Sequence, residues 1–185
     1  MCSSDLGLAD RTLVIFTTDH GDMVGAHGCI GKSVTGFYED LLHIPFLMRL
    51  PGVIRPGTVV DRPVSQIDVM PTILDLTGRT APGGIHGRSL RPLIEGRDVP
   101  WRDHAFCQRA NHQFMIRTAT HKYVFGPKPP MVALYDLKAD PDENRNLAEA
   151  PEHADLVRTM HRRLVEVMKA DGATTVLSGD PFAAP

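Results

Sequence analysis

The fold is decided by residues 12–22, which read Thr-Leu-Val-Ile-Phe-Thr-Thr-Asp-His-Gly-Asp. Residues 12–18 form a short apolar and β-branched run, which is typical of a strand buried on both faces in a parallel sheet. The turn formers 19–22 follow this strand, at the end where the chemistry of open α/β sheets takes place. A second run of the same kind, Ile44–Arg49, predicts another buried strand. The sequence therefore predicts an α/β fold with a functional loop after residue 18.

The later segments predict a helix, a group of short strands and a last helix. Apolar residues recur at helical spacing over residues 68–77, and Asp68 is expected to cap that helix. Residues 151–170 carry an apolar stripe at helical spacing, and His153 and His161 on that helix are expected to be solvated. Short gaps favour an antiparallel meander for the strands between the helices, predicted over residues 104–109, 113–118, 122–125 and 132–137.

The order of these elements predicts two structural parts. Residues 1–11 are expected to be an unstructured or extraneous lead-in, and residues 173–185 a loose tail. Between them, residues 12–92 are expected to be the C-terminal part of an α/β domain. Residues 93–172 are expected to form a small α+β subdomain with an antiparallel sheet and a C-terminal helix. Two buried strands are fewer than a doubly wound sheet usually carries, so the α/β part is expected to be incomplete or to pair with another chain.

Composition excludes several classes of protein. With 42% hydrophobic residues the chain of 185 residues has enough apolar mass for a core. Its 20 Lys+Arg against 22 Asp+Glu give a net charge of −2, without the basic excess of a nucleic-acid-binding protein. The longest apolar run, residues 131–135, is far too short to span a membrane. The three cysteines show no CxxC spacing, so neither a disulfide framework nor a cysteine zinc site is predicted.

Asp19 and His20 are the sharpest local signal for chemistry. A carboxylate and an imidazole on one loop can both reach a divalent cation, since carboxylate oxygens suit Ca²⁺ or Mg²⁺ and imidazole tolerates Zn²⁺ or Mn²⁺. Two ligands are too few for any of these ions, so the others must come from elsewhere. The alternative is a capping aspartate beside a hydrogen-bonded loop histidine.

Lys32 and His27 lie in the glycine-rich segment after this pair. Lys32 follows Asp19 by 13 residues, and an ammonium group among glycines can approach a phosphate or sulfate oxygen. The alternative for Lys32 is a solvated surface lysine. His27 could orient or protonate a bound group, although a single loop histidine usually does neither. The histidines of the predicted meander are expected to serve surface or packing roles rather than a substrate pocket: His104, His112 and His121.

Several motifs follow one another in order along the chain. The first is the run over residues 12–28, followed by Lys32 and by Ile44-Pro45-Phe46. The next are residues 64–78 and Gly87-Arg88-Ser89-Leu90. The last are Leu134-Tyr135-Asp136-Leu137, Asp140-Pro141-Asp142-Glu143-Asn144 and Asn146-Leu147-Ala148. Together, over about residues 12 to 170, these motifs resemble the sulfatase family, part of the alkaline-phosphatase-like superfamily, and the last group is similar to the C-terminal signature of that family.

This resemblance implies a fold, an activity and roles for individual residues. The fold would be the C-terminal part of an alkaline-phosphatase-like sandwich with a mostly parallel sheet. Asp19 and His20 match a pair of metal ligands, most often for Ca²⁺, with Mn²⁺ or Zn²⁺ as other options. Lys32 matches the lysine that contacts the sulfate group and, together with His27, is the expected catalytic set. The implied activity is hydrolysis of a sulfuric ester, either a small molecule or a carbohydrate sulfate, in which a hydrated formylglycine attacks sulfur.

The chain departs from the family at the nucleophile. Formylglycine is made from a Cys or Ser that begins the pattern Cys/Ser-x-Pro/Ala-x-Arg, and no Cys or Ser in this sequence begins it. The family's first metal-binding pair, Asp-Asp, is also absent. The resemblance therefore implies a C-terminal portion, with formylglycine in an N-terminal part and no activity for this chain alone. Two alternatives stay open, namely a phosphonate monoester or phosphodiester hydrolase of the same superfamily and a non-catalytic fragment or binding module. Oligomeric state and compartment are not predicted.

Overall fold

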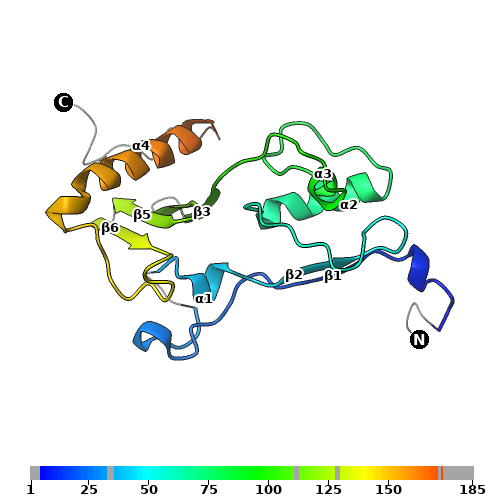
Figure 1. The fold of residues 1–185 in the computed structure, drawn as a ribbon, viewed down its shortest axis with the longest axis horizontal. Coiled ribbons are helices and arrows are strands. Elements are labelled where there is room, and N and C mark those ends of the chain that lie inside the picture. The colour runs from blue at the N-terminus through cyan, green and yellow to red at the C-terminus, as the bar shows by residue number, and fades with distance from the viewer. Residues whose placement is uncertain (1–4, 33–35, 111–112, 128–129, 171, 173–185) are drawn as a thin grey trace. The chain divides into compact units, whose positions relative to one another are not determined.

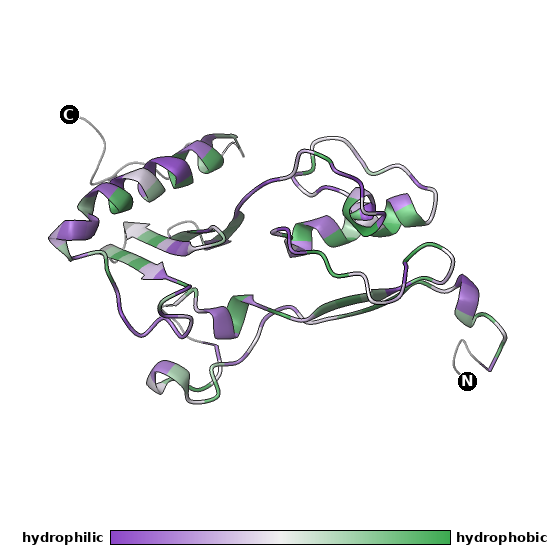
Figure 2. Cartoon of the chain, viewed as in Figure 1, coloured by the Kyte–Doolittle hydropathy of each residue, from purple (hydrophilic) through white to green (hydrophobic). Residues whose placement is uncertain are grey.

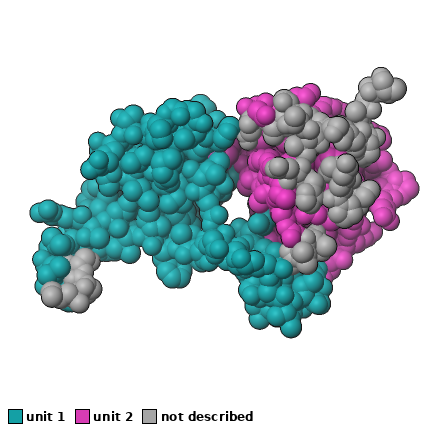
Figure 3. Space-filling view, turned by 180° about the vertical axis from the view of Figure 1, so that it is seen from behind, with its two compact units in different colours: residues 1–34, 40–101 teal, residues 35–39, 102–185 magenta. Residues whose placement is uncertain are grey.

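The structure is a computed structural model that describes residues 5–32, 36–110, 113–127, 130–170 and 172. His112 lies outside the described residues. The chain divides into two compact units, shown in separate colours in Figure 3. The first unit comprises residues 1–34 and 40–101, and the second comprises residues 35–39 and 102–185. Within the described ranges, no helix is long and apolar enough to cross a membrane.

The described residues of the first unit contain one pair of strands and several short helices (Figure 1). Strands β1 (Val14–Thr17) and β2 (Phe46–Arg49) pair with each other, and helices α2 (Val69–Leu76) and α3 (Arg91–Ile94) pack together. Three single turns of 3-10 helix complete it: Ala9–Arg11, Ala26–Gly28 and Gln66–Asp68. The four-residue helix α1 (Glu39–Leu42) starts with the last residue of the segment 35–39 and continues in the first unit.

Strands β1 and β2 form as predicted, but their pairing and burial differ from the expectation. They pair antiparallel, with Ile15 opposite Met48, so these two strands do not form the expected parallel sheet. Val14, Phe16 and Leu47 are exposed rather than buried, and Phe16 retains 63% of its accessible surface. Burial on both faces requires a covering layer on each side, and among the described residues this sheet has two strands only.

The predicted helix over residues 68–77 is confirmed as α2, which directly follows the 3-10 turn Gln66–Asp68. Pro71 is buried in the first turn of α2, where no intrahelical bond needs its missing N–H. Gly78 has a φ of 73° and ends the helix, and the amide of Arg79 then donates to the carbonyl of Leu74. The helix therefore begins and ends where its proline and glycine require.

In its described residues the second unit is a four-stranded antiparallel sheet with one long helix, as predicted. Its strands pair in sequence order, which confirms the meander. The helix α4 (Ala154–Ala170) lies along one face of this sheet (Figure 1). Figure 2 shows polar and apolar residues interspersed along α4, as expected for an amphipathic helix. The four strands are β3 (Ala105–Arg109), β4 (Gln113–Arg117), β5 (His121–Pro127) and β6 (Pro130–Asp136).

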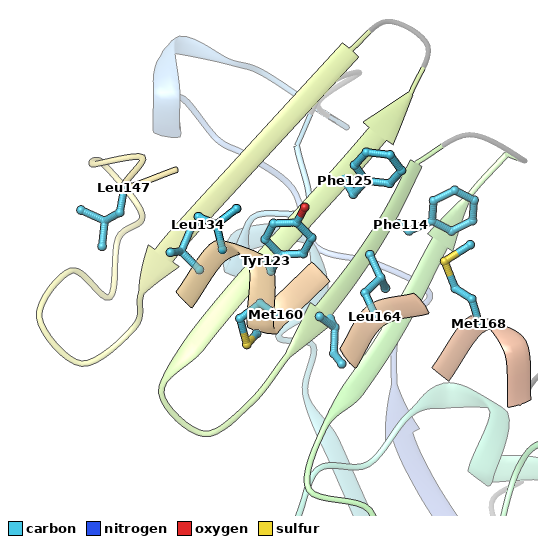
Figure 4. Close-up of a cluster of buried hydrophobic side chains, with 10 residues drawn as sticks. Phe114, Tyr123, Phe125, Leu134, Leu147, Met160, Leu164 and Met168 are labelled. Atoms are coloured by element: carbon cyan, nitrogen blue, oxygen red, sulfur yellow. The ribbon is translucent and has the colours of Figure 1, made fainter. Parts of the chain in front are cut away.

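The core of the second unit lies between the sheet and α4. Apolar side chains of β4, β5 and β6 converge on those of α4 in Figure 4, including Phe114, Tyr123, Leu134, Leu164 and Met168. All five have essentially no exposed surface. Burying such a side chain contributes about 1.5–3 kcal/mol, so this cluster is the main source of stability for the second unit.

The expectation that His161 is solvated is wrong. His161 is only 3% exposed, and its Nδ1 shares a hydrogen bond of 2.9 Å with the hydroxyl of Tyr123. Its ring also meets the ring of Phe125 edge-on, with 4.9 Å between centroids. The physical reason is helical spacing, because residue 161 lies four positions after Val157 and three before Leu164, on the buried stripe.

The segment after β6, which carries the C-terminal signature, is organised by side chains bonded to the backbone. The Asp140 carboxylate accepts the amides of Asn144 and Arg145. The Asn146 side-chain oxygen accepts the amide of Leu134, and its NH₂ donates to the carbonyl of Val132. The loop is thereby bonded to strand β6. Asp136 closes a turn by accepting the amides of Lys138 and Ala139.

A buried ionic cluster, which we call the Lys122 cluster, joins this loop to residues 37–39. The ammonium of Lys122 lies 2.7 Å from Glu39 Oε1, from Glu143 Oε1 and from the carbonyl oxygen of Phe37. Arg117 also pairs with Glu39 at 3.1 Å, and the Glu39 amide donates to Glu143 Oε2 at 2.7 Å. The side chains of Lys122 and Glu143 are 0% and 1% exposed. The cluster therefore links Glu39 and the Phe37 carbonyl to the rest of the second unit through the buried side chains of Lys122 and Glu143, while the side chain of Glu39 stays 19% exposed.

Candidate functional site

The candidate metal ligands lie on the loop that follows β1. The Thr18 hydroxyl donates to Asp19 Oδ1 at 3.3 Å and to the carbonyl of His20 at 3.1 Å, and the His20 amide donates to Asp19 Oδ1 at 3.1 Å. These bonds occupy Oδ1 of Asp19. The other oxygen, Oδ2, faces His20 Nε2 at 3.4 Å, with 80% of the Asp19 side chain and 34% of the His20 side chain exposed.

The bonding of His20 determines which of its ring nitrogens can act as a ligand. Nδ1 lies 2.6 Å from the carbonyl oxygen of Gly21. A carbonyl oxygen only accepts, so Nδ1 must carry the proton of this bond and Nε2 of the neutral ring keeps a lone pair. That lone pair faces the Oδ2 lone pairs of Asp19. Two acceptors at this distance repel each other unless a cation or a proton lies between them.

The Asp19 carboxylate is held in its charged form. Slight desolvation raises the pKa of Asp19. When a proton lies between Oδ2 and Nε2, the resulting charge on His20, together with hydrogen bonds from backbone amides and Thr18, outweighs desolvation and keeps this pKa below its usual value. A charged oxygen and an imidazole lone pair 3.4 Å apart can both coordinate one ion at metal–ligand distances of about 2.0–2.6 Å. The pair thus fits a divalent cation as a partial ligand set. Among the described residues no group of three or more His, Cys, Asp or Glu gathers around one point.

Residues 21–32 form a loop whose two ends are bonded together. The Asp22 carboxylate accepts the amides of Val24 at 2.9 Å and Gly31 at 3.1 Å, and the Met23 amide donates to the Gly31 carbonyl at 3.1 Å. Met23 is buried and anchors the base of the loop. Gly21 is required beside it, because a Cβ at that position would lie 1.8 Å from the Asp40 carbonyl oxygen.

The structure separates the two residues expected to be catalytic. Lys32 is exposed and directly follows Gly31, at the closed base of the loop that begins after Asp19 and His20. His27 lies in the 3-10 turn at the tip, beyond the bond from the Gly25 amide to the Cys29 carbonyl, and has a left-handed φ of 51°. The bond from the Gly31 amide to Asp22 therefore returns the chain, just before Lys32, to the first residues of the loop. The catalytic role of His27 stays a prediction.

Gln66 is the residue of this site that the sequence did not indicate. Its Nε2 donates to the carbonyls of Thr18 at 2.7 Å and of Asp19 at 3.0 Å. No periodicity or motif spacing points to this contact, because the partners lie 47 and 48 residues earlier in the chain.

Asp68 fixes the turn that carries Gln66, and its role differs from the expected cap at the first position of α2. Its carboxylate, in a fully buried residue, accepts the amides of Ser65 and of Arg88, each at 2.9 Å. With Ser65 it forms a capping box around the 3-10 turn. Gly87 packs so closely against this turn that a Cβ would lie 1.9 Å from the Ile67 carbonyl oxygen.

The two described histidines of the predicted meander, His104 and His121, have local partners. His104 Nδ1 lies 3.2 Å from an Asp103 carboxylate oxygen, and His121 Nδ1 shares a bond of 2.9 Å with the Thr120 hydroxyl. These contacts support the surface and packing roles expected for His104 and His121.

Comparison with known proteins defines the class to which this fold and loop belong. The family model for the C-terminal region of N-sulphoglucosamine sulphohydrolase matches residues 25–170. The chain belongs to this family and is thus the C-terminal portion of a sulfatase-type protein of the alkaline-phosphatase-like superfamily. This confirms the resemblance and the expected fold class.

Curated relatives agree with this assignment. An arylsulfatase from Clostridium perfringens is 31% identical over 174 residues, which cover 90% of this chain and 35% of that protein. A multifunctional alkaline phosphatase superfamily protein, PehA, from Trinickia caryophylli is 37% identical over 176 residues, covering 83% of this chain and 34% of its own length. The chain thus spans about a third of the length of these relatives.

Solved structures place the fold in the same superfamily. The structure of BT4656 in complex with its substrate D-glucosamine-2-N,6-O-disulfate superimposes with a TM-score of 0.86 at 27% identity, covering 94% of this chain and 37% of that one. The phosphonate monoester hydrolase of Agrobacterium radiobacter gives a TM-score of 0.81 at 30% identity, with coverage of 91% and 37%.

Proposed function

We propose that this chain supplies the C-terminal third of a sulfuric ester hydrolase, in which Asp19 and His20 hold a divalent cation and Lys32 contacts the sulfate group. The observation that supports this most directly is the facing pair of acceptors, Asp19 Oδ2 and His20 Nε2, 3.4 Å apart on an exposed loop. Ca²⁺ is the first candidate because of the carboxylate, and Mn²⁺ or Zn²⁺ would also suit the imidazole.

Each residue of the pair contributes a different property. Asp19 supplies a charge, because its lowered pKa keeps the carboxylate ionised near neutral pH. His20 supplies a lone pair at Nε2, because the Gly21 carbonyl holds the proton on Nδ1. When bound, a divalent cation would polarise the oxygens of the ester group and offset their charge.

Lys32, at the base of the loop, would offset the same negative charge on the oxygens of the ester group. Its ammonium can stabilise the negative charge that builds on the sulfate oxygens as the ester bond breaks. His27 would then be available to protonate the departing alcohol if the loop tip closes over the substrate. The nucleophile is not supplied by this chain, since its sequence lacks the Cys/Ser-x-Pro/Ala-x-Arg pattern, and formylglycine is proposed for the N-terminal part of a longer protein.

A sulfated small molecule or carbohydrate is the proposed substrate class. The structural relative BT4656 has a glucosamine disulfate as its substrate, and the matched family model is that of an N-sulphoglucosamine sulphohydrolase. A second candidate is hydrolysis of phosphonate monoesters or phosphodiesters, which two phosphonate monoester hydrolases with TM-scores of 0.81 and 0.82 favour. Sulfate and phosphonate esters present similar charged tetrahedral groups, so Asp19, His20 and Lys32 could serve either.

The test measures hydrolysis of an aryl sulfate and an aryl phosphonate ester by the longer protein that we propose, with and without EDTA. Asp19→Asn should lower kcat/KM at least about 100-fold, since loss of outer partners of metal ligands already costs about 10–100-fold. Asp10→Asn, the same change at an exposed aspartate that pairs with Arg49, is the matched control. Wild-type rates for Asp19→Asn would refute the assignment. The ratio of the two substrates separates the two functions, and the 185-residue chain alone should be inactive.

A further inference from the structure

We infer that Gln66 is a positioning residue for the Asp19–His20 pair, an inference that rests on the function proposed above. The two hydrogens of its NH₂ group go to consecutive carbonyl oxygens, those of Thr18 at 2.7 Å and Asp19 at 3.0 Å. One of these carbonyls belongs to the peptide plane before the Cα of Asp19 and the other to the plane after it. A single planar amide therefore fixes both planes on which the direction of the Asp19 side chain depends.

The backbone that Gln66 holds has few other long-range bonds. Thr18, Asp19 and His20 bond mostly to one another, through the Thr18 hydroxyl and the Asp19 carboxylate. Such local bonds keep the shape of the loop but do not hold it to the rest of the unit. On either side of them, Thr17 pairs with Phe46 of β2 and the Gly21 amide donates to the Leu41 carbonyl at 2.9 Å. Gln66 supplies the attachment between these two points, at Thr18 and Asp19.

The turn that carries Gln66 is itself rigid. Asp68, fully buried, bonds to the amides of Ser65 and Arg88, on either side of Gln66 in the chain. The Asp68 carbonyl accepts the hydroxyl of Thr72, which in turn accepts the amide of Leu90. An exposed glutamine on a rigid turn, with both amide hydrogens directed to the ligand loop, is a support for the metal pair rather than part of the core.

The first experiment needs no metal. Backbone order parameters are measured by ¹⁵N relaxation on the 185-residue chain, for wild type, Gln66→Met and the control Gln108→Met. Methionine keeps the length of glutamine without the donors, and Gln108 donates a comparable exposed bond to the carbonyl of Ala110 in the second unit. In Gln66→Met the order parameters of the Asp19 and His20 amides should fall from about 0.85 toward 0.6. In Gln108→Met these order parameters should not change. Wild-type order in Gln66→Met would overturn the inference.

The second experiment follows the broadening of the Asp19, His20 and Gly21 amide signals by Mn²⁺ alone. Gln66→Met should need about tenfold more Mn²⁺ for equal broadening, the lower end of the effect of outer-shell partners, with an unchanged urea midpoint. The Asp19→Asn variant tests the proposed metal site separately from the positioning role of Gln66. If Asp19→Asn broadens like wild type, the proposed metal site fails, and the order parameters alone decide the role of Gln66. If only Asp19→Asn weakens the broadening, the inference about Gln66 fails and the site stands.

Discussion

Replacing Lys122 by methionine is the sharpest test of how the Lys122 cluster holds residues 37–39 against the rest of the second unit. The substitution removes the ammonium at 2.7 Å from both Glu39 and Glu143 and fills most of the same space with an apolar side chain. Glu39 keeps its pair with Arg117 at 3.1 Å, so the uncompensated charge is that of Glu143, whose side chain is 1% exposed.

The magnitude follows from that unpaired carboxylate. Breaking a buried ion pair by removing one partner costs about 3–5 kcal/mol, and in a domain of this size each kcal/mol lowers the melting temperature by about 4–8 °C. Lys122→Met should therefore lower the free energy of unfolding by about 3–5 kcal/mol and the melting temperature by at least about 12 °C. Urea denaturation and calorimetry measure both quantities. Lys138→Met, the same change at an exposed lysine of the same unit, is the control and should have almost no effect.

The pH dependence of this loss identifies its cause. Burial raises the pKa of Glu143 even in the presence of Lys122, whose charge lowers it, so the pKa should rise further in Lys122→Met. A raised carboxyl pKa in the folded state gives stability that is present at acid pH and is lost as pH rises through that pKa. The destabilisation by Lys122→Met should thus be smaller at pH 5 than at pH 7.5.

The pKa of Glu39 is shifted in the opposite direction to the pKa of Glu143, and a double variant completes the test. Burial would raise the pKa of Glu39, but Arg117 and Lys122 outweigh it and lower this pKa, so its contribution is lost as pH falls. Lys122→Met combined with Glu143→Gln removes the orphaned charge and should recover a large part of the lost stability. Equal destabilisation at both pH values, together with a double variant as unstable as the single one, would refute the reasoning.

Two further predictions concern the ligand loop and the core. Gly21→Ala places a Cβ 1.8 Å from the Asp40 carbonyl oxygen, so it should shift the loop and lower the free energy of unfolding of the first unit by about 1–3 kcal/mol, the usual cost of overpacking. Gly83→Ala, where no atom lies within 4 Å, is its control, and equal urea midpoints for the two variants would contradict the prediction. Leu164→Ala should cost about 2–5 kcal/mol in urea denaturation because Leu164 is fully buried between α4 and the sheet. The same change at the exposed Leu6 should cost almost nothing, and a similar small cost at Leu164 would show that this core is not the main source of stability.

The sequence predicted the elements whose signals are local. The helix α2 follows from apolar spacing between a proline and a glycine, and α4 and the meander follow from their periodicities and short gaps. The same spacing placed His161 on the buried stripe of α4, but its polar ring led to the wrong expectation of solvation. Periodicity was therefore the better guide than residue type at that position.

The features that the sequence could not predict depend on contacts between distant residues. The apolar run of β1 is compatible with either strand direction, so the antiparallel pairing with β2 had no local signal. Lys122 lies 83 residues after Glu39, and Gln66 lies 48 residues after Thr18, and nothing in a single sequence marks such partners. Of the candidate site, the placement of Asp19 and His20 on one loop was predictable. The bond from His20 Nδ1 to the Gly21 carbonyl, which sets the ring of His20, was not.

The passage of the chain through α1 limits how this molecule can be divided. Residues 35–39 belong to the second unit although they precede most of the first in sequence. A polypeptide of residues 102–185 alone would lack the Phe37 carbonyl that accepts from Lys122 and the Glu39 carboxylate. Arg117 and Lys122 would then be two cations against the single carboxylate of Glu143. Residues 102–185 therefore do not form a self-contained unit. Gene fusions, truncations or recombination events that cut between residues 101 and 102 would separate a partnership that only the continuous polypeptide provides.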